Sequence, residues 1–444
     1  MSLQPLSKAN TSTRDAFTAA MAGFRLWPDA KIAVAVSGGG DSMALLRLLQ
    51  KWSDEHHVTL YALTVDHCLR DASADEAAQV GAWSATLGVP HTTLRWEEGA
   101  ELRGQPRSLQ SEAREARYGM LTAWCAIHNF SHLFIGHHAD DQIETFLLRL
   151  SRGSGVDGLA AMAPLSVRDG ILIARPLLGI AKAELLAVCR EAGQAWIDDP
   201  SNENTASARV RFRQSRAFLV REGLTDERLL ATVAHLQRAK AALDYAVNAL
   251  LMSACVWDEL GVATLHIPSF AAAPDEISLR ALSRVLVGAS GQIYGPRFEG
   301  LERVHQRLKA GPWQNATLHG AVLEREGDLL RVFRESAAIP DTTEIKTAHL
   351  VWDGRFRVTC EKLDAGLLTV RALTPTAWRE IAEGAADSPA GHAPARIRAT
   401  LPAIYDTHGL VAVPHAAYLR SDAASLALVV ACISGSHTRG DAEL

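Results

Sequence analysis

Residues 31–49 read KIAVAVSGGGDSMALLRLL and contain an apolar run, a polar turn at 37–42 and a stretch with helical spacing. This order predicts a β-strand, a tight turn and an amphipathic helix. Glycines allow the backbone to turn sharply and to approach a ligand closely. The helix that follows presents unpaired N–H groups and the positive end of its dipole to the turn. Such a turn favours the binding of anions, and we interpret this one as a binding site for nucleotide phosphates.

Asp41 is the unusual residue of this turn. A carboxylate is repelled by phosphate unless a divalent cation lies between them. A Walker P-loop would instead carry Lys, in the spacing GxxxxGK[ST], and neither is present. The glycines alone would also fit an ordinary strand-to-helix connection of a parallel sheet that binds no phosphate. We therefore expect Asp41 to hold Mg²⁺, and the following residues to cradle phosphates: Ser37, Gly38, Gly39, Gly40 and Ser42.

The hexapeptide resembles the SGGxDS signature of the N-type ATP pyrophosphatases, also called the PP-loop superfamily. Members of this superfamily are similar in fold and in their first chemical step. They cleave ATP between the α- and β-phosphates and place AMP on a substrate oxygen. The resemblance therefore implies ATP and Mg²⁺ as cofactors, with pyrophosphate as the leaving group.

Apolar runs alternate with helical spacing through the first half of the chain, in the order KIAVAV, VTLYALTVD, HTTLRW and SHLFIG. This alternation predicts an α/β fold with a doubly wound parallel sheet, which the resemblance identifies as adenine nucleotide α-hydrolase-like. In such sheets ligands bind beyond the carboxyl ends of the strands. The turn at 37–42, the strand end at 66–67 and the strand end at 136–138 all fall on that edge.

Three domains are expected. Residues 1–218 form the ATP-binding catalytic domain, 219–337 a helical domain and 345–436 a small β-rich domain. A β-hairpin is predicted around 326–328. The segment 336–346 is interpreted as a linker, and the Ala/Gly/Pro segment 383–395 as a mobile loop outside the core.

Composition restricts the function classes. No apolar run approaches the ~20 residues that a membrane span needs, and the first residues lack a signal-peptide core. The 6 cysteines include no CxxC pair, so neither a disulfide framework nor a tetrahedral metal site is indicated. We expect a cytoplasmic protein. The net charge of −5 does not by itself indicate nucleic acid, which makes the local distribution of arginines decisive.

A second polar cluster, HHADDQIET, spans 137–145. Asp141 and Glu144 share one helical face, while Asp140 is a candidate helix cap. A transition-metal site of two His and two Asp is an alternative, although the adjacent His137 and His138 do not readily face one ion. We prefer that His137 and Asp141 face ATP, and that Asp141 joins Asp41 around Mg²⁺.

Five ordered blocks between about 31 and 215 resemble the tRNA(Ile)-lysidine synthetase family: 65–77, 112–118, 137–162, 175–185 and 196–204. The C-terminal half resembles it more weakly. Members ligate lysine to C2 of the wobble cytidine of tRNA(Ile) with a CAU anticodon, through an adenylated cytidine. The resemblance implies two partners, this tRNA and free L-lysine. It also implies that Arg114 is a catalytic cation, the alternative being a solvated ion-pair face. Asp140 and Glu144 are the candidates for binding lysine.

Arginines follow the turn-rich DDPSNEN segment with few acids among them: Arg209, Arg211, Arg213, Arg216 and Arg221. Arginines of this kind bind phosphates without reading sequence, so the first four are predicted to contact tRNA. The alternative is a helix whose arginines pair with neighbouring acids.

Two other functions stay open at this point. A 2-thiocytidine synthetase is disfavoured because its chemistry uses paired cysteines. A non-catalytic ATP-binding regulator would bind nucleotide without needing lysine or tRNA. The sequence also leaves open whether the chain forms a homodimer.

Overall fold

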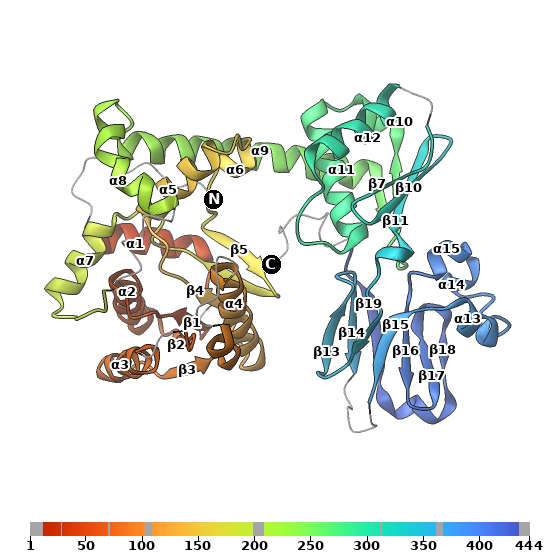
Figure 1. The fold of residues 1–444 in the computed structure, drawn as a ribbon, viewed down its shortest axis with the longest axis horizontal. Helices are drawn as coiled ribbons and strands as arrows, with labels where there is room; N and C mark the ends of the chain where they lie inside the picture. The colour runs from red at the N-terminus through yellow and green to blue at the C-terminus, as the bar shows by residue number, and fades with distance from the viewer. Residues whose placement is uncertain are drawn as a thin grey trace. The chain divides into compact units, whose positions relative to one another are not determined.

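The computed structural model describes residues 12–27, 29–69, 72–102, 109–198, 208–310, 313–360 and 367–434. The chain divides into two compact units, 1–240 and 241–444 (Figure 1). The expected three-domain boundaries stay a prediction. None of the helices within the described ranges combines the length and the apolar character that crossing a bilayer requires.

A six-stranded sheet forms the centre of the first unit, in the order β3-β2-β1-β4-β6-β5. All neighbouring pairs run parallel except β5, which is antiparallel to β6 at the edge. The predicted doubly wound sheet is therefore confirmed. Its strands are β1 (Lys31–Ala35), β2 (Thr59–Asp66), β3 (His91–Arg95), β4 (His132–Phe134), β5 (Leu165–Arg168) and β6 (Ile171–Ala174).

Helices cover both faces of this sheet, and the alternation of side chains along β1 shows why. Ile32 and Val34 pack into a core with α1 (Thr13–Met21), α2 (Gly40–His56) and α7 (Lys182–Glu191). Ala33 packs into a separate core with α4 (Leu109–Ile127). The other helices of this unit are α3 (Ser73–Thr86), α5 (Ala139–Leu150), α6 (Val156–Leu159) and α8 (Ala208–Arg221), and α9 (Asp226–Ala254) continues into the second unit.

The second unit begins with helices packed on a five-stranded antiparallel sheet of order β7-β8-β11-β10-β9. The predicted hairpin is confirmed, since β10 pairs with β11 on either side of Gly327. The strands are β7 (Cys255–Trp257), β8 (Ala263–His266), β9 (Ala316–Leu318), β10 (Ala321–Glu326) and β11 (Leu329–Arg334). The helices are α10 (Ile267–Ala272), α11 (Asp275–Ser290) and α12 (Phe298–Ala310).

Two further antiparallel sheets make the rest of the second unit β-rich, in the orders β12-β15-β16-β17-β18 and β13-β14-β19. The strands are β12 (Thr342–Glu344), β13 (His349–Trp352), β14 (Phe356–Cys360), β15 (Thr369–Ala372), β16 (Pro402–Asp406), β17 (Gly409–Val413), β18 (Tyr418–Leu419) and β19 (Leu428–Cys432). Short helices α13 (Pro375–Ile381), α14 (Pro389–His392) and α15 (Ala395–Arg398) accompany them.

Two expectations for this region were wrong. The segment interpreted as a linker contributes β12, which pairs with β15, and its Ile345 is buried. The segment 383–395 is not a loop outside the core, because Ala385 and Ala390 are almost fully buried. Small side chains let α14 pack tightly, since a Cβ on Gly391 would lie 2.3 Å from the Ala385 carbonyl oxygen.

A buried charge cluster joins β11 to the turn between β13 and β14. Asp353 accepts hydrogen bonds from Arg334 (Nη2 to Oδ1, 2.7 Å) and from Arg355 (Nε to Oδ2, 2.7 Å). All three side chains are at most 3% exposed. One carboxylate thus compensates two buried guanidinium groups, and Arg355 also donates to the Thr400 carbonyl over 2.7 Å.

Burial of His415 predicts an acid-sensitive second unit. Burial, together with the charge of Arg355, lowers the pKa of His415 to about 4. The unfolded chain binds the proton near pH 6.5, so stability is complete above that pH and falls as the pH decreases towards 4. We expect a loss of about 3 kcal/mol in the free energy of unfolding across this window. Denaturant titrations at several pH values measure it.

Replacement of the imidazole tests the source of that loss. His415→Leu should flatten the pH dependence between 6.5 and 4, whereas His408→Gln, at a histidine that is 84% exposed, should leave it unchanged. An unchanged slope in His415→Leu would assign the acid sensitivity to other groups.

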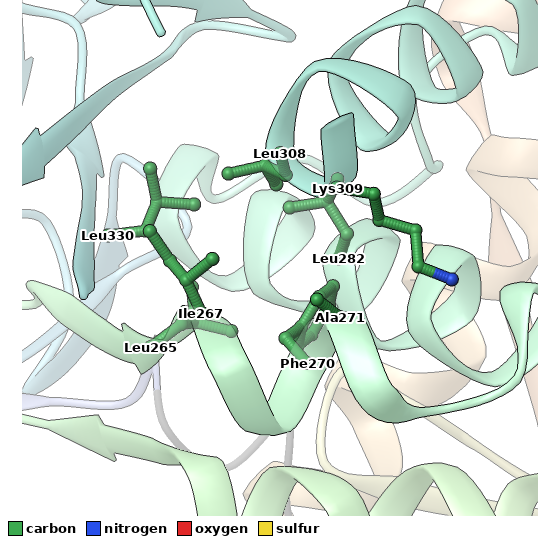
Figure 2. A pocket seen from close by; sticks show the side chains of 8 residues that line it. All are labelled: Leu265, Ile267, Phe270, Ala271, Leu282, Leu308, Lys309 and Leu330. Atoms are coloured by element: carbon green, nitrogen blue, oxygen red, sulfur yellow. The ribbon is translucent and has the colours of Figure 1, made fainter. Parts of the chain in front are cut away.

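An apolar hollow lies among α10, α11, α12 and the adjacent sheet of the second unit (Figure 2). Its lining consists of Leu, Ile, Phe and Ala side chains and the stem of Lys309. The Lys309 ammonium points away from these apolar side chains and pairs with Asp275. Such a lining offers no polar group to orient a nucleotide or an amino acid, so the hollow is a packing feature.

Candidate active site

The turn at 37–42 connects β1 to α2 and is organised by its own serines. Ser42 Oγ accepts from the Ser37 N–H over 3.1 Å and donates to the Gly39 carbonyl over 2.9 Å. Gly38 has φ +88°, a conformation that other residues rarely adopt. Because α2 begins at Gly40, the N–H groups of its first turn face the carboxyl edge of the sheet, as an anion site requires.

Neighbouring side chains would have to shift to admit a Cβ at Gly38 or Gly40, whereas Gly39 has room for one. A Cβ on Gly38 would lie 2.7 Å from Ile197 Cδ1, and one on Gly40 would lie 2.4 Å from Leu186 Cδ2. The Ile197 N–H also donates to the Gly38 carbonyl over 2.9 Å. The turn is therefore held in place by α7 and by the chain that follows it.

Asp41 lies between two cationic groups. Its Oδ2 is 3.3 Å from His138 Nε2 and 3.5 Å from Lys182 Nζ. Burial raises the pKa of Asp41, but the hydrogen bond and charge of His138 and the charge of Lys182 outweigh burial, so the pKa lies below its usual range. The other oxygen, Oδ1, is buried without a hydrogen-bond partner. An ionised carboxylate with one free buried oxygen is a suitable ligand for a divalent cation.

His138 connects the two predicted polar clusters. Its Nε2 lies 3.5 Å from Asp141 Oδ2 as well as 3.3 Å from Asp41 Oδ2, and its Nδ1 lies 3.6 Å from Asp140 Oδ2. Burial lowers the pKa of His138, yet the three carboxylates reverse this effect and raise the pKa above its usual value. The structure thus brings Asp41 and Asp141 to the same imidazole, as the prediction of a shared site requires.

Asp140 and Asp141 occupy the first turn of α5. Asp141 Oδ2 accepts from the His138 N–H over 3.0 Å. Asp140 Oδ2 accepts from the Lys182 N–H over 2.9 Å and so caps α7 instead of its own helix. His137 immediately precedes His138 and is half-buried. Across the described residues, no three or more His, Cys, Asp or Glu side chains could hold a metal by themselves, which gives the transition-metal alternative no support.

The acids predicted to bind lysine are paired with arginines predicted to bind tRNA. Glu144 Oε1 accepts from Arg213 Nε and Nη2 over 2.9 and 2.8 Å. Arg216 pairs with Asp140 and with Asp226. These ion pairs join α8 to α5 and to the start of α9, around a small pocket that the three helices line. The arginine prediction stays open: Arg211 is exposed, and the side chain of Arg209 lies outside the described residues.

Arg114 is exposed on α4, with its Cζ 5.2 Å from the ring centroid of Tyr118. Sequence reasoning assigned no role to His138, Lys182 or Arg175. Lys182 and Arg175 lie in the block 175–185, and the resemblance of this block to the synthetase family is a sequence signal for both residues. Nothing local to the sequence shows that Lys182 reaches Asp41, because the two residues are brought together only by the packing of α7 on α2.

Known proteins resemble this chain over much of its length. Residues 10–217 match the PP-loop domain family. A tRNA(Ile)-lysidine synthase of Ruegeria pomeroyi is 39% identical over 333 residues, which cover 75% of this chain and 77% of the relative. The chain belongs to the tRNA(Ile)-lysidine synthase family.

Other members of the synthase family show similar matches. The synthase of Wolbachia pipientis is 36% identical over 74% of this chain and 77% of its own length. The synthase of Hyphomonas neptunium is 39% identical over 72% of this chain and 86% of its own length. The resemblance seen in the five sequence blocks is thereby confirmed.

Proposed function

We propose that this chain makes lysidine in tRNA(Ile) with a CAU anticodon, using ATP and free L-lysine. One observation carries the proposal: in a chain of the synthase family, Asp41 of the glycine turn and Asp141 of α5 meet at His138 on the ligand-binding edge of the sheet. This arrangement suits a reaction in which triphosphate charge is held beside a second substrate.

The first step joins AMP to the tRNA. The C2 oxygen of the wobble cytidine attacks the α-phosphorus of ATP, and the bond to the β-phosphate oxygen breaks, which releases pyrophosphate. The turn N–H groups and the hydroxyls of Ser37 and Ser42 bind the phosphates, and His137 faces the nucleotide. Arg114 stabilises charge on the reacting nucleotide.

Asp41, with its free buried oxygen, and Asp141 are the residues that would hold Mg²⁺. The ion would supply neutralisation of phosphate charge. Lys182 and His138 keep Asp41 ionised and fixed in position, because both lie within 3.5 Å of its Oδ2. His138 also holds Asp141 in place, since its Nε2 lies 3.5 Å from Asp141 Oδ2.

In the second step the ε-amine of lysine attacks C2. The bond from C2 to the adenylated oxygen breaks, AMP leaves with that oxygen, and the amine loses a proton. No protein nucleophile is needed, so alignment of the two substrates is the main demand on the chain. Asp140 and Glu144 are the acids proposed to attract the amine, in exchange for their present partners Arg216 and Arg213. Released in this way, Arg213 and Arg216 are proposed to contact the tRNA backbone together with Arg209 and Arg211.

The test is transfer of labelled lysine to a CAU-anticodon tRNA(Ile) transcript. We expect a labelled nucleoside only when ATP, lysine and this tRNA are all present, with AMP and pyrophosphate released. A transcript with a UAU anticodon is the matched control. Nucleotide binding without lysine transfer would favour the regulator, and incorporation of sulfur would favour a thiolation enzyme.

A further inference from the structure

Four arginines of the first unit lie around Tyr118. Arg168, whose Cζ is 4.6 Å from the ring centroid, is paired with acids. The other three form what we call the arginine cluster: Arg114, Arg117 and Arg175. The first two lie one turn apart on α4, with their Cζ atoms 5.2 and 5.6 Å from the Tyr118 ring centroid. Arg175 directly follows β6, at the carboxyl edge of the sheet. Arg175 therefore starts from the ligand-binding edge, and the cluster joins this edge to α4.

The arginine cluster has no acidic partner within the described part of the chain. The nearby acids Glu115 and Asp169 both pair with Arg168 instead. Arg175 Nη1 donates to neutral acceptors, the Ala163 carbonyl over 3.1 Å and Ser166 Oγ over 2.9 Å.

The Nε atoms of Arg117 and Arg175 are buried without a hydrogen-bond partner. Burial lowers the pKa of both arginines, the charge of Arg114 lowers it further, and Tyr118 offsets only part of the effect. Both side chains are half-buried. Partly buried guanidinium groups without a counter-charge are unfavourable, and an anion that enters the cluster reduces this penalty.

We propose that Arg117 and Arg175 of the arginine cluster bind a phosphate group of the tRNA anticodon loop beside the reacting cytidine, while Arg114 keeps its role at the reacting nucleotide. The proposal rests on the proposed function. Guanidinium forks match the geometry of phosphate oxygens. A base turned out of a single-stranded loop is held in register by contacts to its flanking phosphates.

Arg175 lies apart from the phosphate turn that is proposed to bind ATP. The phosphate turn follows β1, whereas Arg175 follows β6, and β4 lies between these strands. Arg114 is exposed, so the cluster is open to a ligand that arrives from solvent. The carboxylate of free lysine has related chemistry and is the competing occupant that the experiment distinguishes.

The experiment compares Arg117→Gln and Arg175→Gln with the wild-type chain in tRNA binding at several salt concentrations. Each variant should weaken binding about tenfold and lower the slope of log affinity against log salt by about 1, since one phosphate contact is lost. The KM for tRNA should rise while the KM values for ATP and lysine stay unchanged. Arg14→Gln, which removes an arginine paired with Glu55, is the matched control and should change none of these values.

Arg175→Lys is a second control, because it changes the same side chain but keeps its positive charge. Its salt slope should stay near the wild-type value, which would assign the effect of Arg175→Gln to the lost charge and not to misfolding. A raised KM for lysine with an unchanged salt slope would overturn the proposal in favour of the lysine carboxylate. Unchanged tRNA binding in both folded glutamine variants would overturn it in favour of a structural role. Because tRNA binding is measured without turnover, these outcomes are distinct from a wild-type chain that makes no lysidine.

Discussion

Asp41→Asn is expected to lower the rate of lysidine formation about 100- to 1,000-fold, because it removes the charge that opposes His138 and Lys182 and would hold the metal ion. The substitution preserves the shape of the side chain, so the fold and the packing of α2 should remain. Release of pyrophosphate in a single turnover, with saturating tRNA and lysine, measures the effect on the first step.

Asp54→Asn is the matched control for this variant. Asp54 is an exposed acid on the same helix, where it accepts a hydrogen bond from Gln50. Its substitution should leave pyrophosphate release unchanged. If Asp41→Asn kept more than a tenth of the wild-type rate, the assignment of Asp41 to the reacting phosphates would be refuted.

Asp353→Asn is expected to destabilise the second unit by about 3–5 kcal/mol. The variant leaves Arg334 and Arg355 buried with no negative partner, and neither side chain can reach water, since both are at most 3% exposed. Asp353 has φ +52°, a conformation that Asn adopts as readily as Asp, so backbone strain does not contribute. Chemical denaturation, followed by a probe in the second unit, measures the loss.

Asp422→Asn is the surface counterpart of this substitution. Asp422 pairs with Arg420 but is 67% exposed, and exposed pairs of this kind contribute about 0–1 kcal/mol. If Asp353→Asn and Asp422→Asn lowered the free energy of unfolding equally, burial of the Asp353 cluster would not be the cause of the loss.

The sequence allowed prediction of those parts of the fold whose signals are local. The alternation of apolar runs with helical spacing predicted the parallel sheet, and the glycine turn marked its ligand-binding edge. The predicted turn at 37–42 is too long, because Gly40, Asp41 and Ser42 already belong to the first turn of α2. The segment 383–395 was misjudged because alanine and glycine have little hydrophobic signal, even where they fill a core.

Prediction of the site succeeded for residues that lie within one motif and failed for those supplied by other elements. Asp41 and Asp141 were recognised from their own motifs. The contact of Lys182 with Asp41 depends on α7 packing against α2, which no local pattern specifies. The pairing of Glu144 with Arg213 likewise depends on the docking of α8, and arginine spacing alone does not distinguish a phosphate contact from an internal ion pair.

The bonding of Ser42 has a consequence for ligand discrimination. Its hydroxyl proton is already committed to the Gly39 carbonyl, so a phosphate oxygen that takes this proton must compete with a backbone acceptor. A charged phosphate oxygen accepts a stronger hydrogen bond from Ser42 than the Gly39 carbonyl does, so the hydroxyl turns to the phosphate. An uncharged ligand oxygen accepts a bond of about the same strength, so it does not displace the carbonyl. The loop would therefore reject neutral mimics of the triphosphate through a hydrogen-bond exchange, without any steric barrier.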